Sequence, residues 1–188
     1  MCGFAGYAGE REYDTSVIRK MTDKIRHRGP DSQDAFIEGK VGLGFVRLSI
    51  IDLEGGSQPM FNEDKNLVLI FNGELYNFQD IRKELVEAGH VFTTHTDSEI
   101  LLHGYEEWGK EGLLGRLRGM FAFVIFDRTK KTLFGARDHF GIKPFYYYHK
   151  DGTFLFGSEI KSFLAHPDFQ KELFEEKLPD FMTFGCIP

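Results

Sequence analysis

The chain has 188 residues, 41% of them hydrophobic, which is enough for one well-buried core and favours a single domain over two. Twenty Phe and seven Tyr add a bias toward β-structure, because aromatic side chains suit half-buried pleated surfaces. The formal net charge of -6 argues against nucleic acid and anionic membranes as partners, since both bind through a basic face.

The first half of the chain is predicted to contain three amphipathic helices and one buried strand. A helix over 18–25 follows a cap at Asp14 and places its apolar residues on one stripe. The run 67–71 is apolar at every position, which predicts a strand with both faces covered. Helices over 81–88 and 101–108 each end at the glycine that follows, because glycine readily takes the left-handed conformation of a C-terminal cap.

The second half is predicted to form two hairpins, after which the pattern becomes helical again. One hairpin pairs 121–126 with 132–134 across a polar turn, and its first strand is again apolar on both faces. The other pairs 145–148 with 153–156 across an Asp-Gly turn, which tolerates the positive φ angles of tight turns. Strands with two apolar faces, combined with helices that have one apolar stripe, predict an α+β fold of stacked sheets with helices packed outside.

Cys2 is the first candidate for catalysis, because removal of Met1 would leave one residue with both a thiol and a free α-amine. An α-amine titrates at about 7.7 to 8.0 and a thiol near 8.5, so the amine can accept the thiol proton at neutral pH. The alternative is an incidental cysteine at a frayed terminus, and this interpretation is favoured when Cys2 is considered without the other motifs.

Asn72 and Gly73 follow the predicted strand 67–71 and could supply an amide side chain and a backbone N–H at the end of a sheet. Two such donors can form an oxyanion hole for a tetrahedral intermediate, and loss of one typically raises the barrier by about 2.7 to 4 kcal/mol. An ordinary Asn-Gly turn is the alternative, and it is favoured unless Cys2 is nearby.

Arg47 and Asp97 are candidates for binding the two charged ends of a small substrate. Arg47 follows an apolar stretch and can hold a carboxylate bidentately, although an ion pair with one of the chain's own carboxylates is an even alternative. Thr96 and Glu99 fit a capping box, which leaves Asp97 available for a cation. A thiol, an oxyanion hole, an Arg and an Asp together describe a site for an amino acid that carries a carboxamide.

Metal binding and export are not indicated by the sequence. The seven histidines include no i, i+4 pair with a third ligand, and the two cysteines form no ligand motif or disulfide framework, so no metal is expected. No segment has the pattern of a signal peptide or a membrane span, so the expected compartment is the cytoplasm.

The candidate residues lie within ordered motifs that resemble the class II glutamine amidotransferases. The first two motifs are Cys-Gly-Phe-Ala-Gly at 2–6 and His-Arg-Gly-Pro-Asp at 27–31. The second of these resembles, within the class, the glutaminase domain of asparagine synthetases. The other matching segments are 47–52, 72–77, 96–99, 117–123, 136–138, 141–144 and 157–161.

The resemblance implies an N-terminal nucleophile hydrolase fold, a four-layer αββα sandwich with two antiparallel sheets. It implies that Cys2 attacks the carboxamide of L-glutamine, that Asn72 and Gly73 stabilise the oxyanion, and that a glutamyl thioester is then hydrolysed. Ammonia and glutamate are the products. The residues implied to bind the two ends of glutamine or to line the pocket are Arg47, Leu48, Ile51, Glu74 and Asp97.

The resemblance also implies a domain plan. Residues 1–188 form one glutaminase domain, and 161–188 resemble the junction to an ATP-dependent synthetase domain whose Ser-Gly-Gly-x-Asp-Ser loop does not occur in this sequence. ATP and Mg belong to that domain, so no cofactor is expected here. The expected partners are L-glutamine and a synthetase domain in cis or in trans, and a homodimer is left open. The alternatives are an N-terminal Cys amidase of another amide and a non-catalytic glutamine-binding or regulatory module.

Overall fold

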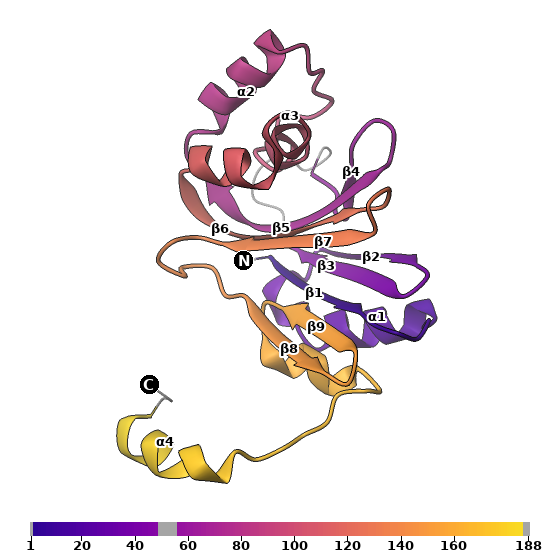
Figure 1. Cartoon of the computed structure of the whole chain (residues 1–188), viewed down its shortest axis with the longest axis vertical. Helices are drawn as coiled ribbons and strands as arrows, with labels where there is room; N and C mark the ends of the chain where they lie inside the picture. The colour runs from indigo at the N-terminus through magenta and orange to yellow at the C-terminus, as the bar shows by residue number, and fades with distance from the viewer. Residues whose placement is uncertain (1, 49–55, 186–188) are drawn as a thin grey trace.

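The computed structural model describes residues 2–48 and 56–185 of the chain (Figure 1). The strands are β1 (Gly3–Ala8), β2 (Ser32–Glu38), β3 (Val41–Arg47), β4 (Met60–Phe61), β5 (Leu67–Leu75), β6 (Gly119–Asp127), β7 (Thr132–Arg137), β8 (Tyr146–Lys150) and β9 (Thr153–Gly157). The α-helices are α1 (Thr15–Asp23), α2 (Phe78–Glu87), α3 (Glu99–Arg116) and α4 (Leu178–Phe184), and the 3₁₀ helices are η1 (Arg26–Arg28), η2 (Ile160–Ala165) and η3 (Glu175–Lys177).

The strands form two antiparallel sheets that stack between helical layers (Figure 1). Within the described residues, one sheet has the order β2-β3-β1-β9-β8 and the other has the order β4-β5-β6-β7. Helices α2 and α3 cover the outer face of the sheet that contains β5, and α1 and η2 pack on the outer side of the sheet that contains β1. This arrangement confirms the predicted α+β class and its four layers.

The strand β5 shows why runs that are apolar at every position form the centre of this fold. Leu67, Leu69 and Phe71 pack in the core beneath α2 and α3, whereas Val68 and Ile70 point into the core between the two sheets. Alternate residues of a strand face opposite sides, so both sides of β5 are removed from water. The paired strand β6 divides its residues between the same two cores, which confirms the prediction that both strands have two covered faces.

The strand β5 also extends further than predicted, through Leu75. Asn72 pairs with Ala122 and Gly73 with Phe121, so both candidate donors lie inside the strand and do not follow its end. The polar composition of 72–74 suggested a turn, but pairing with β6 holds these residues extended. The prediction of a strand end at Phe71 is therefore wrong, and the two donors are fixed by the sheet.

The predicted helices are present, with one difference at a glycine. Asp14 caps α1 by accepting a hydrogen bond from the Ser16 amide at 2.7 Å, as expected. The helix α3 is interrupted at Gly109, whose φ of 66° and ψ of -169° are not helical, but it resumes and continues to Arg116. The resumed turn buries Leu113 in the same core, so the prediction that the helix ends at Gly109 is only partly correct.

The C-terminal part begins with the second predicted hairpin, β8 and β9, joined through Asp151 and Gly152, whose φ angles are 49° and 73°. The helical segment predicted after Ser158 forms as the 3₁₀ helix η2, which buries Phe163. The helix α4 then extends away from the sheets (Figure 1). No helix in the described part of the chain has the length and apolar composition needed to cross a membrane.

Candidate active site

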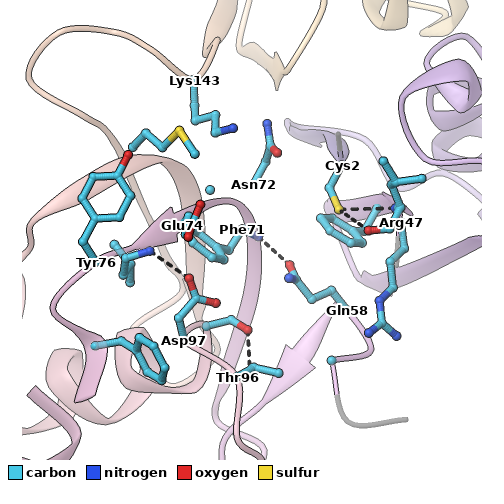
Figure 2. Close-up of a pocket in the computed structure, with 18 of the residues that line it drawn as sticks. Cys2, Arg47, Gln58, Phe71, Asn72, Glu74, Tyr76, Thr96, Asp97 and Lys143 are labelled. Atoms are coloured by element: carbon cyan, nitrogen blue, oxygen red, sulfur yellow. Dashed lines mark hydrogen bonds between the residues drawn. The ribbon is translucent and has the colours of Figure 1, made fainter. Parts of the chain in front are cut away.

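A pocket of about 460 Å³ opens where the beginning of β1, the end of β3, the strand β5 and the segment before α3 meet (Figure 2). It is lined by every candidate site residue that the structure describes, and these come from four separate parts of the sequence. Ile51, which was also expected to line the pocket, lies outside the described residues. The lining candidates are Cys2, Arg47, Leu48, Asn72, Gly73, Glu74 and Asp97.

Cys2 is held in the pocket by contacts to its thiol and to its backbone. The Leu48 amide donates to the Cys2 Sγ at 3.4 Å, and the thiol lies 3.5 Å from the Leu48 carbonyl oxygen (Figure 2). Arg28 Nε donates to the Cys2 carbonyl at 3.0 Å, and the same guanidinium pairs with Glu159 at 3.1 Å. A Cβ at position 3 would lie 2.8 Å from the Arg28 side chain, so Gly3 permits this close approach. The thiol is therefore held in the pocket by the backbone of Leu48, and the Cys2 carbonyl is held by Arg28.

Asn72 presents a buried amide nitrogen that no group in the described part of the chain accepts from. Its side chain is only 2% exposed, and Nδ2 has no hydrogen-bond partner within the described residues. Figure 2 shows this amide directed into the space between Lys143 and Cys2. An unsatisfied buried N–H costs about 1 to 3 kcal/mol, so its retention in a pocket calls for a ligand acceptor.

The Gly73 amide faces the pocket side of β5 because of the alternation of the strand. The amides of Phe71 and Leu75 donate to Gln58 at 2.6 Å and Asp97 at 2.9 Å, so both point away from β6. Alternate amides of a strand point the same way, so the Gly73 N–H shares this direction. A Cβ at position 73 would lie 2.4 Å from the Met120 carbonyl oxygen, so there is no space for a side chain at this position.

Asp97 is anchored to β5 and not to a helix cap. Its Oδ2 accepts the hydrogen bond from the Leu75 amide (Figure 2). The predicted capping box is wrong: the cap position of α3 is Ser98, and Thr96 Oγ1 bonds to the side chains of Thr94 and Ser98. The Glu99 carboxylate instead accepts the backbone amides of Thr93 and Thr94, both at 2.7 Å. The turn before the helix is thus held by Glu99.

The electrostatics around Asp97 suit a cation. Burial raises the pKa of Asp97 above its ordinary value, and the nearby Glu74 carboxylate adds to this effect, although the hydrogen bond from Leu75 opposes it. Glu74 is an exposed residue that also lines the pocket. Two carboxylates that repel each other are both stabilised when an ammonium group binds between them.

Arg47 ends β3 and lies on the same side of the pocket as Thr96. Its carbonyl accepts the Asp31 amide at 3.1 Å, and its guanidinium extends away from Cys2 (Figure 2). A Cβ at Gly56 would lie 2.9 Å from Arg47 Nη2 and 3.4 Å from Thr96 Cγ2. The structure therefore brings the basic group near the segment that carries Asp97.

Comparison with known proteins decides the family. A family model described as a glutamine amidotransferase domain matches residues 1–188, the full length of the chain. The chain belongs to the glutamine amidotransferase domain family. The chain is also similar to a solved structure of glutamine phosphoribosylpyrophosphate amidotransferase from B. subtilis in complex with ADP and GMP. The match has a TM-score of 0.71 and 23% sequence identity, and it covers 87% of this chain and 43% of the solved chain. This likeness confirms the expected N-terminal nucleophile hydrolase fold.

Curated relatives of the amidotransferase domain carry a more specific name. The domain is 42% identical over 190 residues to asparagine synthetase (glutamine-hydrolyzing) 3 of Bacillus subtilis (strain 168), which covers 98% of the chain and 31% of that protein. It is 39% identical over 168 residues to a probable asparagine synthetase (glutamine-hydrolyzing) of Dictyostelium discoideum, covering 86% of the chain and 30% of that protein. The chain spans about a third of the length of these relatives.

Two residues of the amidotransferase pocket received no role from the sequence. Gln58 is buried and accepts the Phe71 amide, which extends the hydrogen bonding of β5 beyond β4. Lys143 is 8% exposed and lines the pocket with its amine directed toward Asn72 (Figure 2). Lys143 belongs to the matching segment 141–144, so the motif marked its position but gave no reason for its charge.

The loop that carries Lys143 is organised by a single buried carboxylate. Asp138 accepts the backbone amides of Phe121, Phe140, Ile142 and Lys143 at 3.2, 3.2, 2.8 and 2.9 Å. Burial would raise the pKa of Asp138, but these backbone donors outweigh it and the pKa lies below its ordinary value. An ionised Asp138 therefore fixes the loop and presents a basic group to the amidotransferase pocket.

Proposed function

We propose that this domain hydrolyses L-glutamine to glutamate and ammonia with Cys2 as an N-terminal nucleophile. The observation that carries the proposal is the orphaned Asn72 amide, which shares one pocket with the Cys2 thiol. A buried donor with no acceptor among the residues at 2–48 and 56–185 fits the place where an oxyanion develops. The family assignment and the names of the curated relatives support the same reaction.

The proposed reaction begins after Met1 is removed. The free α-amine of Cys2 takes the thiol proton, and the thiolate attacks the carboxamide carbon of glutamine. Asn72 Nδ2 and the Gly73 N–H donate to the resulting oxyanion. As the intermediate collapses, the C–N bond breaks and the ammonium of Cys2 returns its proton to the departing nitrogen, which leaves as ammonia. Water then attacks the glutamyl thioester, with the same amine as base, and releases glutamate.

Recognition of a zwitterion separates glutamine from simple amides. We assign the α-ammonium to Asp97 and Glu74, because these carboxylates lie close enough for one to raise the pKa of the other. Arg47 is assigned the α-carboxylate, since its guanidinium lies on the neighbouring wall. Leu48 serves through its backbone contact to the thiol as well as through its side chain. An amidase for uncharged amides would have no use for this charge pattern.

The released ammonia is proposed to serve an ATP-dependent synthetase domain of the asparagine synthetase type. The curated relatives bear that name and are about three times as long as this chain. Within the proposed junction 161–188, Phe163 packs in the domain core, so the part available to another domain lies nearer to α4. Exposed apolar side chains there include Leu173, Phe174, Phe181, Met182 and Phe184. ATP and Mg would be bound by the synthetase domain alone.

The test is glutamate release from L-glutamine by the purified chain, after mass spectrometry shows that Met1 has been removed. Turnover that Cys2→Ala abolishes, while circular dichroism shows an intact fold, would establish the nucleophile. Turnover of N-acylated amides but not of glutamine would favour the alternative amidase. Glutamine binding without turnover would favour a binding or regulatory module. The cytoplasmic compartment and the homodimer remain predictions, which cell fractionation and light scattering of the same chain would test.

A further inference from the structure

Two histidines and a glutamate converge outside the pocket, on the side of α3 that meets the end of α2. His103 and Glu106 lie three residues apart on α3, and His90 follows Gly89 after α2, where its amide donates to the Leu85 carbonyl at 2.9 Å. The side chain of His103 is 2% exposed, that of His90 17% and that of Glu106 32%. None of these three is among the described residues that line the pocket.

The three facing atoms have the spacing of a metal's coordination shell. His90 Nδ1 and His103 Nδ1 are 3.1 Å apart, and Glu106 Oε2 lies 3.5 Å from His103 Nδ1 and 4.0 Å from His90 Nδ1. The circle through a triangle with these sides has a radius of about 2.1 Å. Zinc binds imidazole nitrogen at about 2.0 to 2.1 Å and carboxylate oxygen at about 2.0 to 2.2 Å. An ion in the plane of the three atoms would therefore lie at metal–ligand distance from each of them.

Each of the three groups is also oriented by a neighbour on its other side. Glu107 lies 3.2 Å from His90 Nε2, and Glu63 lies 3.4 Å from His103 Nε2. Asn62 Nδ2 donates to Glu106 Oε1 at 2.7 Å, which leaves Oε2 for the shared centre. Histidine ligands of metal sites commonly donate their second ring N–H to a carboxylate, which fixes the tautomer and the ring orientation.

Histidine tautomers with the proton on Nε2 would leave the shared centre lined by ring lone pairs and a carboxylate oxygen. If both Nε2 atoms carry protons for their carboxylates, the two Nδ1 atoms meet as lone pairs at 3.1 Å. A proton on one Nδ1 would satisfy that pair, but Glu106 Oε2 at 3.5 Å would stay beyond ordinary hydrogen-bond length.

We propose that His90 Nδ1, His103 Nδ1 and Glu106 Oε2 bind one divalent transition-metal ion of the Zn²⁺ class. Water completes the coordination on the side where Glu106 is exposed. The ligands join the segment after α2 to the first half of α3, so the ion stabilises the packing of these two helices. Its three ligands do not line the pocket that holds Cys2 and Asn72, and no chemical step of amide hydrolysis is assigned to the ion.

A zinc-uptake measurement tests this site directly. The full chain carrying Cys2→Ala, which removes thiol binding in the pocket, is stripped with a chelator, incubated with ZnCl₂ and passed through a desalting column. We expect one zinc per chain by elemental analysis and a thermal unfolding midpoint that rises with added zinc. A Co²⁺-loaded sample should show visible absorption typical of nitrogen and oxygen ligands.

Matched variants locate the ion. His90→Gln and Glu106→Gln should each lose the stoichiometric zinc and the rise in unfolding midpoint, while His139→Gln, at an exposed histidine elsewhere, should retain both. Glu107→Gln leaves all three ligands in place and should weaken zinc binding by about 10- to 100-fold, as expected for a group that orients a ligand. Failure of the parent chain to retain zinc, or equal retention by folded His90→Gln, would overturn the proposal and leave a proton-bridged histidine pair.

Discussion

Replacing Asn72 with alanine should separate catalysis from stability. Asn72 is proposed to donate to an oxyanion that exists only in the transition state, so its loss should reduce kcat and leave KM for glutamine nearly unchanged. Removal of one oxyanion donor typically raises the barrier by about 2.7 to 4 kcal/mol, which corresponds to a kcat about 100- to 1000-fold lower. The assay is glutamate release under saturating glutamine, with Met1 removal verified.

The same substitution should leave the free energy of unfolding almost unchanged. The Asn72 Nδ2 group has no hydrogen-bond partner in the described residues, so truncation breaks no bond and removes a buried N–H that costs about 1 to 3 kcal/mol. Lost packing of a small side chain offsets part of this gain. We expect a net change within about 1 kcal/mol, or a shift in Tm of no more than about 2 to 4 °C for a domain of this size.

Asn77→Ala provides the opposite control five residues away. Asn77 Nδ2 donates to the Arg116 carbonyl at 2.9 Å, and its Oδ1 accepts the Arg118 amide at 3.0 Å, so this side chain is used by the fold. Its loss should destabilise by about 2 kcal/mol, lowering Tm by roughly 4 to 8 °C, with kcat retained. The reasoning about Asn72 is refuted if Asn72→Ala lowers Tm as much as Asn77→Ala, or keeps wild-type kcat.

Two further predictions concern the charges in the pocket. Lys143→Met keeps the length of the side chain but removes a cation beside Asn72. We expect kcat to fall about tenfold, which corresponds to a loss of about 1.4 kcal/mol of transition-state stabilisation. The control is Lys171→Met, at an exposed lysine. Because burial and Glu74 raise the pKa of Asp97, this group is neutralised at a higher pH than an ordinary aspartate. KM for glutamine should therefore rise as the pH falls through that raised pKa, whereas KM of Asp97→Asn should be high and flat over the same range.

The sheets were predictable from the sequence because their central strands have no polar face. The run 67–71 and the run 121–126 could only be buried on both sides, and each divides its side chains between two cores. Local turn chemistry was equally informative at Asp151 and Gly152, where positive φ angles close a hairpin. These strands and this turn depend on residues that are adjacent in the sequence, so the sequence pattern alone is enough to predict them.

Features in which a residue bonds outside its local motif were not predictable in the same way. Asn72 and Gly73 look like a turn, but the pairing with β6 makes them part of a strand. Thr96 and Glu99 have the spacing of a capping box, but the Glu99 carboxylate instead accepts the backbone amides of Thr93 and Thr94, both at 2.7 Å. In both cases a local preference yields to hydrogen bonds that only the folded chain offers.

The histidine cluster was missed for the same physical reason. A search for ligands at i, i+4 examines one helix at a time, whereas His90 approaches His103 from the segment after a different helix. Helix packing brings the two rings together, and the sequence contains no fixed spacing that would reveal it. The only local signal is the i, i+3 pair of His103 and Glu106, which is common on helices without any ligand.

The segment 93–99 links the pocket to the histidine cluster. Burial would raise the pKa of Glu99, but its contact with His103 and its hydrogen bonds from Thr93 and Thr94 lower the pKa to about 2, so Glu99 stays ionised. Two residues earlier, Asp97 is fixed to Leu75, on the strand that carries the proposed oxyanion donors. The carboxylate assigned to the substrate ammonium is therefore positioned by a buried anion whose counter-charge lies at His103. Positive charge at the cluster, whether a proton or a metal ion, stabilises the turn that presents Asp97, although it lies outside the pocket.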